Sequence, residues 1–234
     1  MKEADRPQSP FAGQLDFSAR PPVRKLSPEE IDRQLAGHRL YLETEWRQGH
    51  RANFASADLT GRDFAGLNLR GIKMDRALLK GAGFSGTRLQ RANLIGALLE
   101  EARLDDADLV GARLSGANLV SASLENACLA KAEMEFALLA KAALRGANLR
   151  AADLSGALLD GAVLSRADLG EANLRGAGLR DARLDGVDRA MRGWAARFLP
   201  GPRCAALIYA APICVWRGST VRICPMLICA APRA

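Results

Sequence analysis

Large apolar residues recur at every fifth position between residues 54 and 184. The series comprises 27 consecutive positions, and all of them are Leu, Phe or Met. Two residues before each of these central positions, 23 of the 27 units carry Ala, and the exceptions are Arg62, Leu67, Ile72 and Thr87. A period of five excludes one amphipathic α-helix, because 3.6 residues per turn would spread these side chains around the whole cylinder.

The spacing within each five-residue unit predicts a short extended piece followed by a turn. Ala and the central residue are two apart, so an extended backbone points both side chains in the same direction. The last two residues must then turn the chain, and Gly is frequent at the second of them, as at Gly61, Gly66 and Gly81. One unit is therefore one side and one corner of a stacked coil, with the central residues inside.

The repeated unit Ala-(Asp/Asn)-Leu-x-x resembles the pentapeptide-repeat family, and the resemblance covers residues 52–187. It implies an all-β solenoid, namely a right-handed quadrilateral β-helix with four units per coil. Large residues cluster near the start of the array and predict wider first coils: Phe54, Phe64, Leu67, Ile72 and Phe84. Arg62 occupies an inward position, where an unpaired charge is costly. We expect it to reach solvent at the N-terminal end, or to pair with Asp63 or with an acid of the cap.

Both ends of a solenoid need covers. Residues 27–50 predict an N-terminal capping helix, with Ser27 as the N-cap and Pro28 in the first turn. An apolar stripe follows at helical spacing: Ile31, Leu35, His38, Leu42 and Trp46. Residues 1–26 contain four prolines and mixed charge and are expected to be disordered.

Downstream of the repeats at 51–187, Asp188 is a possible cap for a second short helix over 188–200. Residues 201–234 form an irregular, basic tail with four of the five cysteines. Three interpretations of this tail stay open: a disordered segment, an apolar adhesive segment, or a sequence not translated in the ancestral reading frame.

The net charge of +7 comes from one part of the chain. Residues 189–234 carry seven Arg and no acid, whereas residues 52–188 carry seventeen basic and eighteen acidic residues. The repeats therefore lack the basic groove of a nucleic-acid-binding protein, and no nucleic acid partner is expected. They also lack the strongly acidic surface that mimicry of DNA requires.

No candidate enzyme machinery emerges. The two histidines, His38 and His50, lie outside the repeats, and His38 falls on the apolar stripe of the capping helix as a packed residue. Residues 81–86 match a dinucleotide-binding fingerprint by letter only, since Phe84 is a core position and no strand–turn–helix unit surrounds it. Cys224 and Cys229 lack a second ligand pair for zinc. We expect no cofactor, no metal and no catalysis.

The chain shows neither an apolar stretch of membrane-spanning length nor a signal peptide, so a cytoplasmic location with reduced cysteines is expected. Five acids lie close together in sequence: Glu100, Glu101, Asp105, Asp106 and Asp108. Such a cluster is ordinarily a solvated surface, and weak cation binding or a basic partner is the alternative reading.

One outward column is unusually apolar. If units stack every twenty residues, the positions preceding the central residue on one side read Asp58, Leu78, Leu98, Asn118, Leu138, Leu158 and Gly178, with Val120 and Ala140 beside them. An apolar surface on a rod is typical of a contact site. The candidate partner-binding residues are Leu78, Leu98, Val120, Leu138 and Leu158. The occupant could be an unknown protein, a second copy or the chain's own tail, and a tolerated run of Ala-Leu-Leu units is the plainer explanation.

The sequence thus predicts a non-enzymatic structural or protein-interaction module that presents flat solenoid faces. The alternative is a DNA mimic that protects a type II topoisomerase, a role that the resemblance to this family brings with it.

Overall fold

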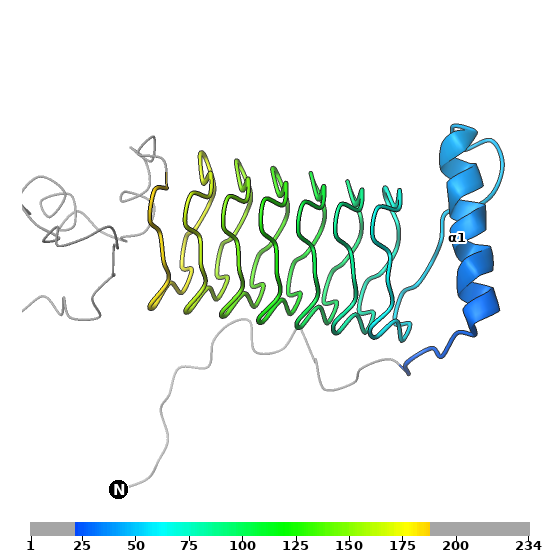
Figure 1. Ribbon diagram of the computed structural model, residues 1–234, viewed down its shortest axis with the longest axis horizontal. Coiled ribbons are helices and arrows are strands. Elements are labelled where there is room, and N and C mark those ends of the chain that lie inside the picture. Colours follow the sequence, from blue (N-terminus) through cyan, green and yellow to red (C-terminus); the bar gives the residue numbers. More distant parts are fainter. Residues whose placement is uncertain (1–21, 188–234) are drawn as a thin grey trace, which may run out of the picture.

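The structure is a computed structural model that describes residues 22–187, and it consists of a stack of coils closed at one end by a helix (Figure 1). The helix, α1, spans Pro28–Glu43 and lies across the first coil. Residues 1–21 lie outside the described residues, as do the expected C-terminal helix at 188–200 and the tail at 201–234. No helix within 22–187 is long and apolar enough to cross a membrane.

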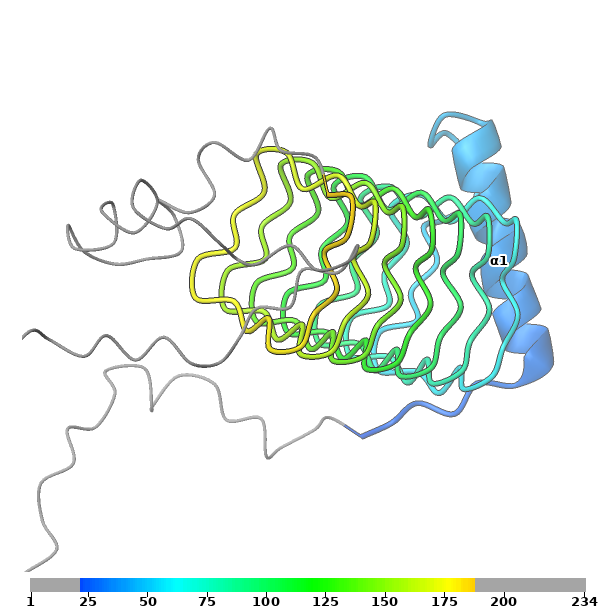
Figure 2. The ribbon, with the colours of Figure 1, turned by 60° about the vertical axis from the view of Figure 1, so that its left-hand side comes forward.

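Parallel β-bridges join residues that are twenty positions apart, from Asn53 and Lys73 at one end to Val163 and Arg183 at the other. Twenty residues are four five-residue units, so each coil has four sides, and Figure 2 shows the coils stacked one behind another. Each side contributes a single residue to these twenty-residue bridges, and residues 22–187 contain no longer strand. The architecture is the right-handed quadrilateral β-helix that the resemblance to the pentapeptide-repeat family implies.

The central residues fill the axis of the rod. All of them from Phe54 to Leu174 are buried, together with most of the alanines two positions earlier. The rings of Phe64 and Phe84 stack with their centroids 5.1 Å apart. Thr87, which replaces one of the alanines, is buried and donates a hydrogen bond from Oγ1 to the Phe64 carbonyl at 2.8 Å. Leu67 is an exception to the prediction for the first coils, because 40% of it is exposed.

The corners explain the glycines of the repeat. The carbonyl of each central residue accepts the N–H three residues later, as from Ala97 to Leu94 at 3.0 Å. The second turn residue has a positive φ, for example 61° at Gly96 and 56° at Arg91. Gly adopts this conformation without steric cost, which accounts for its frequency at this position.

The backbone also explains why Asp and Asn are common before the central residue. At each of these positions the side-chain Oδ1 accepts the N–H of the residue two positions later, as Asn118 accepts from Val120 at 3.2 Å. The residues that do so are Asn53, Asp58, Asp63, Asn68, Asn93, Asp108, Asn118, Asn148, Asp153, Asp168 and Asn173. The preference thus reflects the local satisfaction of a turn N–H group.

The capping helix begins as expected, because the Ser27 side chain accepts the Glu30 N–H at 3.2 Å. It ends at Glu43, earlier than the segment 27–50, and is capped by Thr44, whose hydroxyl donates to the Leu40 carbonyl at 2.7 Å. The placement of Trp46 on the helical stripe was wrong. Its backbone has a φ of 73°, its N–H donates to the Tyr41 carbonyl, and its side chain is 67% exposed.

The lid contacts the first coil through buried residues. Ile31 and His38 of α1 are buried, and His38 Nδ1 accepts the Ala52 N–H at 3.3 Å, so His38 is the packed residue that the sequence predicts. Arg62 is half-buried. The hydrogen bond with Ser27 is the main cause that lowers the pKa of Glu29, and the charges of Arg33 and Arg62 lower it further.

The prediction that residues 1–26 are disordered was wrong for residues 22–26. Arg24 forms a parallel bridge with Ala57, and its N–H donates to the Ser56 carbonyl at 2.8 Å. Residues 22–26 therefore extend the first coil before α1 begins.

Candidate interaction surfaces

The apolar column that the sequence predicts runs along one side of the rod, here called the leucine side. Successive bridges place Asp58, Leu78, Leu98, Asn118, Leu138, Leu158 and Gly178 directly above one another. Leu138 is 36% exposed and Leu158 is 46% exposed, whereas Leu78 and Leu98 are partly covered. The exposed leucines therefore gather in the half of the rod away from the lid.

Phe136 enlarges this surface, and our sequence analysis did not select it. Its ring is 72% exposed and stands at the corner that precedes Leu138. It lies over Gly156 of the next coil, where an added Cβ would come within 2.6 Å of the ring. A signal was available in the sequence: Phe136 follows the central residue Met134 by two positions, and a residue in that register lies at a corner.

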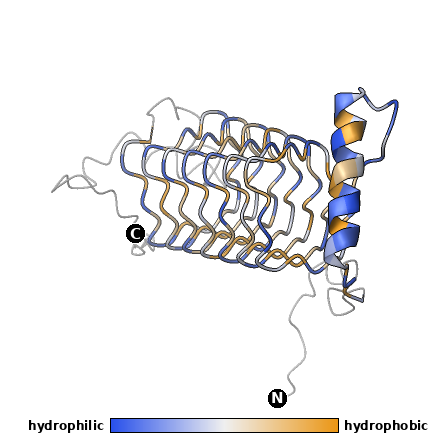
Figure 3. Cartoon of the chain, turned by 45° about the vertical axis from the view of Figure 1, so that its right-hand side comes forward, coloured by the Kyte–Doolittle hydropathy of each residue, from blue (hydrophilic) through white to orange (hydrophobic). Residues whose placement is uncertain are grey.

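Gly178, which has no side chain, leaves Leu158 uncovered at the end of this surface. It stands above Leu158 in the column, and a Cβ there would lie 3.3 Å from Leu158 Cδ2. The exposed patch, hereafter the Phe136 patch, consists of Phe136, Leu138 and Leu158. Val120 lies beside the column one coil earlier and is half-buried. Figure 3 shows hydrophobic and hydrophilic residues alternating along the coils.

The five acids are not brought together in one cluster. They lie along three successive sides of one coil, because the bridge residues of these sides are Leu98, Arg103 and Asp108. Glu101 pairs with Lys80 at 3.3 Å and Glu100 accepts from Asn118 Nδ2 at 2.6 Å. Asp105 accepts from Ser123 and Asp108 accepts from Gln90, while Asp106 occupies an exposed corner with a φ of 58°. In the described part of the chain, no group of acids, histidines or cysteines has the arrangement to hold a metal ion.

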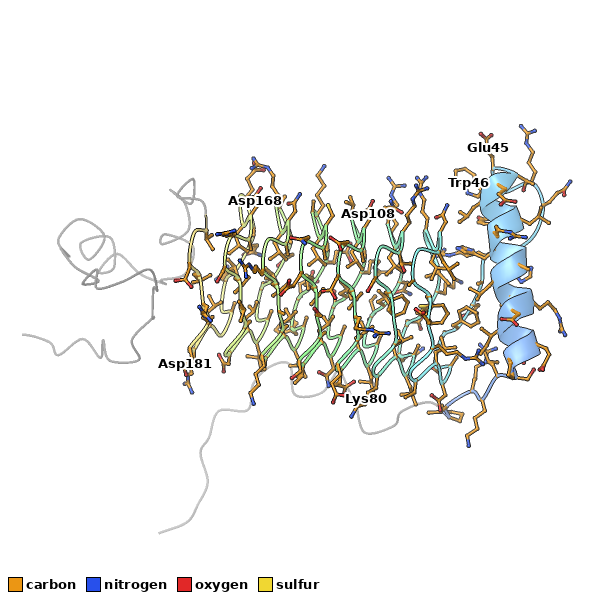
Figure 4. The ribbon with its side chains drawn as sticks, in the orientation of Figure 1. Glu45, Trp46, Lys80, Asp108, Asp168 and Asp181 are labelled. Atoms are coloured by element: carbon orange, nitrogen blue, oxygen red, sulfur yellow. The ribbon has the colours of Figure 1, made fainter. Side chains whose placement is uncertain are left out.

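The charged side chains that form ion pairs link neighbouring coils at several places. Arg113 pairs with Glu133 at 3.1 Å, and Arg150 pairs with Glu171 at 2.5 Å. Figure 4 shows Asp108 and Asp168 along one long edge of the rod, with Lys80 and Asp181 along the other. Glu45 and Trp46 stand at the top of the lid in the same view. Both signs of charge are thus distributed over the walls.

Comparison with known proteins identifies the repeats. The family model for pentapeptide repeats (8 copies) matches residues 52–91, 82–119, 117–156 and 152–188. A search of curated protein sequences finds no match.

Among solved structures, the chain is similar to QnrB1, a plasmid-mediated fluoroquinolone resistance protein, with 22% identity over 65% of this chain and 86% of that one and a TM-score of 0.42. It is also similar to Rfr23 from the cyanobacterium Cyanothece 51142, with 26% identity, coverage of 64% and 99%, and a TM-score of 0.40. HetL from Nostoc sp. strain PCC 7120, which is involved in regulating heterocyst differentiation, is 33% identical over 58% of this chain and 80% of that one, with a TM-score of 0.20. With the family model spanning the whole rod, the chain belongs to the pentapeptide-repeat family.

Proposed function

We propose that this protein is a non-enzymatic interaction module that binds a protein partner on its leucine side. The observation that supports the proposal is the Phe136 patch, in which three large apolar side chains from neighbouring coils are exposed. Aromatic and aliphatic side chains in such patches are typical anchors of protein–protein contacts.

The demands of folding do not account for the leucines. At the same position on eleven other units, Asp or Asn accepts the N–H of the residue two positions later, as at Asn93, Asn118 and Asn148. Leucine offers no acceptor, and within residues 22–187 the N–H groups of Ala140 and Asp160 make no hydrogen bond. Leu138 and Leu158 therefore give up a local stabilising interaction and expose apolar surface, a combination that favours a role in binding.

The test compares two double variants in the same two coils. Leu138→Asp with Leu158→Asp alters the leucine side, whereas Ala143→Asp with Val163→Asp places the same charges at equivalent positions on the next side. Proteins captured from lysate by the tagged full chain are first identified, and the affinity of each purified candidate is then measured. A partner bound by the wild type and by the control, but lost with the first variant, supports the proposal. Equal binding to all three proteins contradicts it.

Protection of a type II topoisomerase by DNA mimicry is the alternative function, and the distribution of charge does not favour it. One outward column contains Lys73 and Arg113 among its first four residues and Glu133 and Asp153 farther from the lid, so neither sign dominates. A basic DNA-binding groove would select a continuous acidic surface. In a supercoiling assay with a type II topoisomerase and a fluoroquinolone, we expect this protein to give no protection.

A further inference from the structure

We propose that the rod self-associates as an antiparallel dimer through the side that faces away from the leucine side. This side, here called the Cys128 side, is defined by the bridge column Asn68, Arg88, Asp108, Cys128, Asn148 and Asp168. It is two sides removed from the leucine column in each four-sided coil, and Asp108 and Asp168 mark it along the upper edge of the rod in Figure 4. The proposal is independent of the function assigned to the leucine side.

Unpaired charges of opposite sign lie at equal distances from the middle of this column. Arg88 is two bridges before Cys128, and Asp168 is two bridges after it. Within residues 22–187, neither Arg88 nor Asp168 has an ion-pair partner, although the Asp168 carboxylate accepts the Gly170 N–H at 2.8 Å.

The middle of the Cys128 side allows close approach because its side chains are small. Val110, Cys128 and Ala130 are half-buried and uncharged. Asp108 and Asn148 flank Cys128 by one coil each, so a carboxylate acceptor and an amide lie at equal distances from the centre. Arg150, two residues after Asn148, pairs with Glu171 at 2.5 Å.

A two-fold axis perpendicular to the rod at Cys128 brings these features into register. Such a rotation reverses the column, so Arg88 faces Asp168 of the partner subunit twice, and Asp108 faces Asn148 of the partner subunit twice. Closed two-fold contacts of this kind are the commonest form of homo-oligomer. A parallel arrangement would instead place Arg88 against its own copy and Asp168 against its own copy. The charges therefore select the antiparallel dimer, in which both leucine sides stay free.

The contact area is small, and this area limits the expected affinity of the dimer. A side about 10 Å wide and about 30 Å long, from the reach of three extended residues and six coils, is smaller than the roughly 800 Å² per partner of a standard interface. We therefore expect a concentration-dependent dimer of micromolar affinity or weaker, which high salt dissociates because its ion pairs are exposed.

Charge exchange tests the arrangement by sedimentation velocity, with the full chain at about 5 to about 500 µM. Arg88→Asp and Asp168→Arg should each weaken the homodimer by at least about 10-fold, because both attractive pairs become repulsive. An equimolar mixture of the two variants should dimerise again, since every facing pair is then opposite in charge. Asp168→Asn is a milder substitution that removes the charge but keeps the acceptor of the turn N–H. Asn68 and Asn148 already serve as that acceptor at the same position.

Arg145→Asp is the matched control, since it makes the same change of charge on the neighbouring side. It should dimerise as the wild type does, and thermal melts of all variants report whether each is folded. A wild type that stays monomeric at every concentration overturns the proposal. So does a dimer that Arg88→Asp leaves unchanged, because it must use another surface.

Cross-linking at the axis gives a second, positional test. In a full chain with Cys204, Cys214, Cys224 and Cys229 replaced by Ser, Cys128 should link to Cys128 of the partner subunit with bismaleimidoethane. Cys128→Ser with Ser123→Cys moves the thiol to the neighbouring side of the same coil, where we expect the linked product to fall several-fold. Equal yields from both positions contradict a contact centred on Cys128.

Discussion

The ring of Phe136 covers Gly156 of the following coil, so that a Cβ at position 156 would lie 2.6 Å from Phe136 Cδ1. Both residues occupy the second turn position of the same side, with φ values of 57° and 66°. An aromatic side chain at this corner is compatible with the stacking of the coils because the residue above it has no side chain. The exposed Phe136 therefore depends on Gly156.

We predict that Gly156→Ala destabilises the rod more than Gly116→Ala does. Gly116 has a φ of 65° and open space around it, so its replacement costs only the left-handed conformation, about 1–2 kcal/mol. Gly156→Ala must also displace the Phe136 ring, which adds about 1 kcal/mol. Urea unfolding of the two variants measures the difference, and a Phe136→Ala background should remove it. Equal losses of unfolding free energy at both glycines would show that displacing the Phe136 ring does not contribute to the effect.

The buried and exposed leucines should differ sharply in their contribution to stability. Leu114→Ala removes a fully buried side chain from the axis and should lower the free energy of unfolding by about 2–5 kcal/mol. Leu138→Ala, at the half-exposed column position, should cost less than about 1 kcal/mol. Urea denaturation of the full chain tests both. A loss at Leu138 as large as that at Leu114 would mean that Leu138 contributes to the core and is not primarily a binding residue.

The sequence predicts the coils because one period dictates them. Ala and Leu at a spacing of two can both point inward only from an extended side, and glycine at the fifth position allows the left-handed corner. The twenty-residue period also places Leu138 above Asn118 and below Leu158 correctly. These features follow from backbone geometry that every unit shares.

The sequence analysis missed structural features that depend on one specific neighbouring residue. Trp46 continued the helical spacing of α1, but Thr44 takes the Leu40 carbonyl with its hydroxyl and ends the helix before Trp46. The role of Asp and Asn before the central residue was also missed, because the N–H that each accepts is identified only by the turn geometry. The exposed side chain of Phe136 depends on a glycine twenty residues away.

The stability of the lid should fall in mild acid because of His38. Burial is the main cause that lowers the pKa of His38, and the charge of Arg51 lowers it further. The Arg70 backbone raises this pKa by a smaller effect, and His50 makes the smallest contribution, which lowers it. Its Nδ1 must also stay unprotonated to accept the Ala52 N–H.

Because the pKa of His38 is lower in the folded chain than its unfolded value of about 6.5, the unfolded chain binds more protons below that pH. The contribution to stability is therefore complete above about pH 6.5 and decreases as the pH falls below it, by at most about 1.4 kcal/mol per pH unit. Urea unfolding between about pH 8 and about pH 5 measures this slope. His38→Gln should flatten that part of the profile, and an unchanged slope in this variant would assign the effect to other groups.

Asp105 provides a test of how the turn N–H groups are satisfied. Ser123 stands where eleven other units carry Asp or Asn, and the Glu125 N–H is accepted at 2.9 Å by Asp105 Oδ1 from the coil before. Asp160 does the same for the Arg180 N–H at 2.9 Å, where Gly178 holds the equivalent position. A carboxylate of the preceding coil thus replaces the missing local acceptor.

Asp105→Ala should therefore cost about 1 kcal/mol of unfolding free energy, because the Glu125 N–H and the Ser123 hydroxyl both lose their acceptor. Adding Ser123→Asn should recover most of this loss by restoring the local acceptor, as Asn118 does for Val120. In the wild-type background the same substitution should be nearly neutral, since the Glu125 N–H already has an acceptor. Urea unfolding of the four proteins completes a double-mutant cycle, and purely additive effects would show that the two acceptors do not substitute for each other.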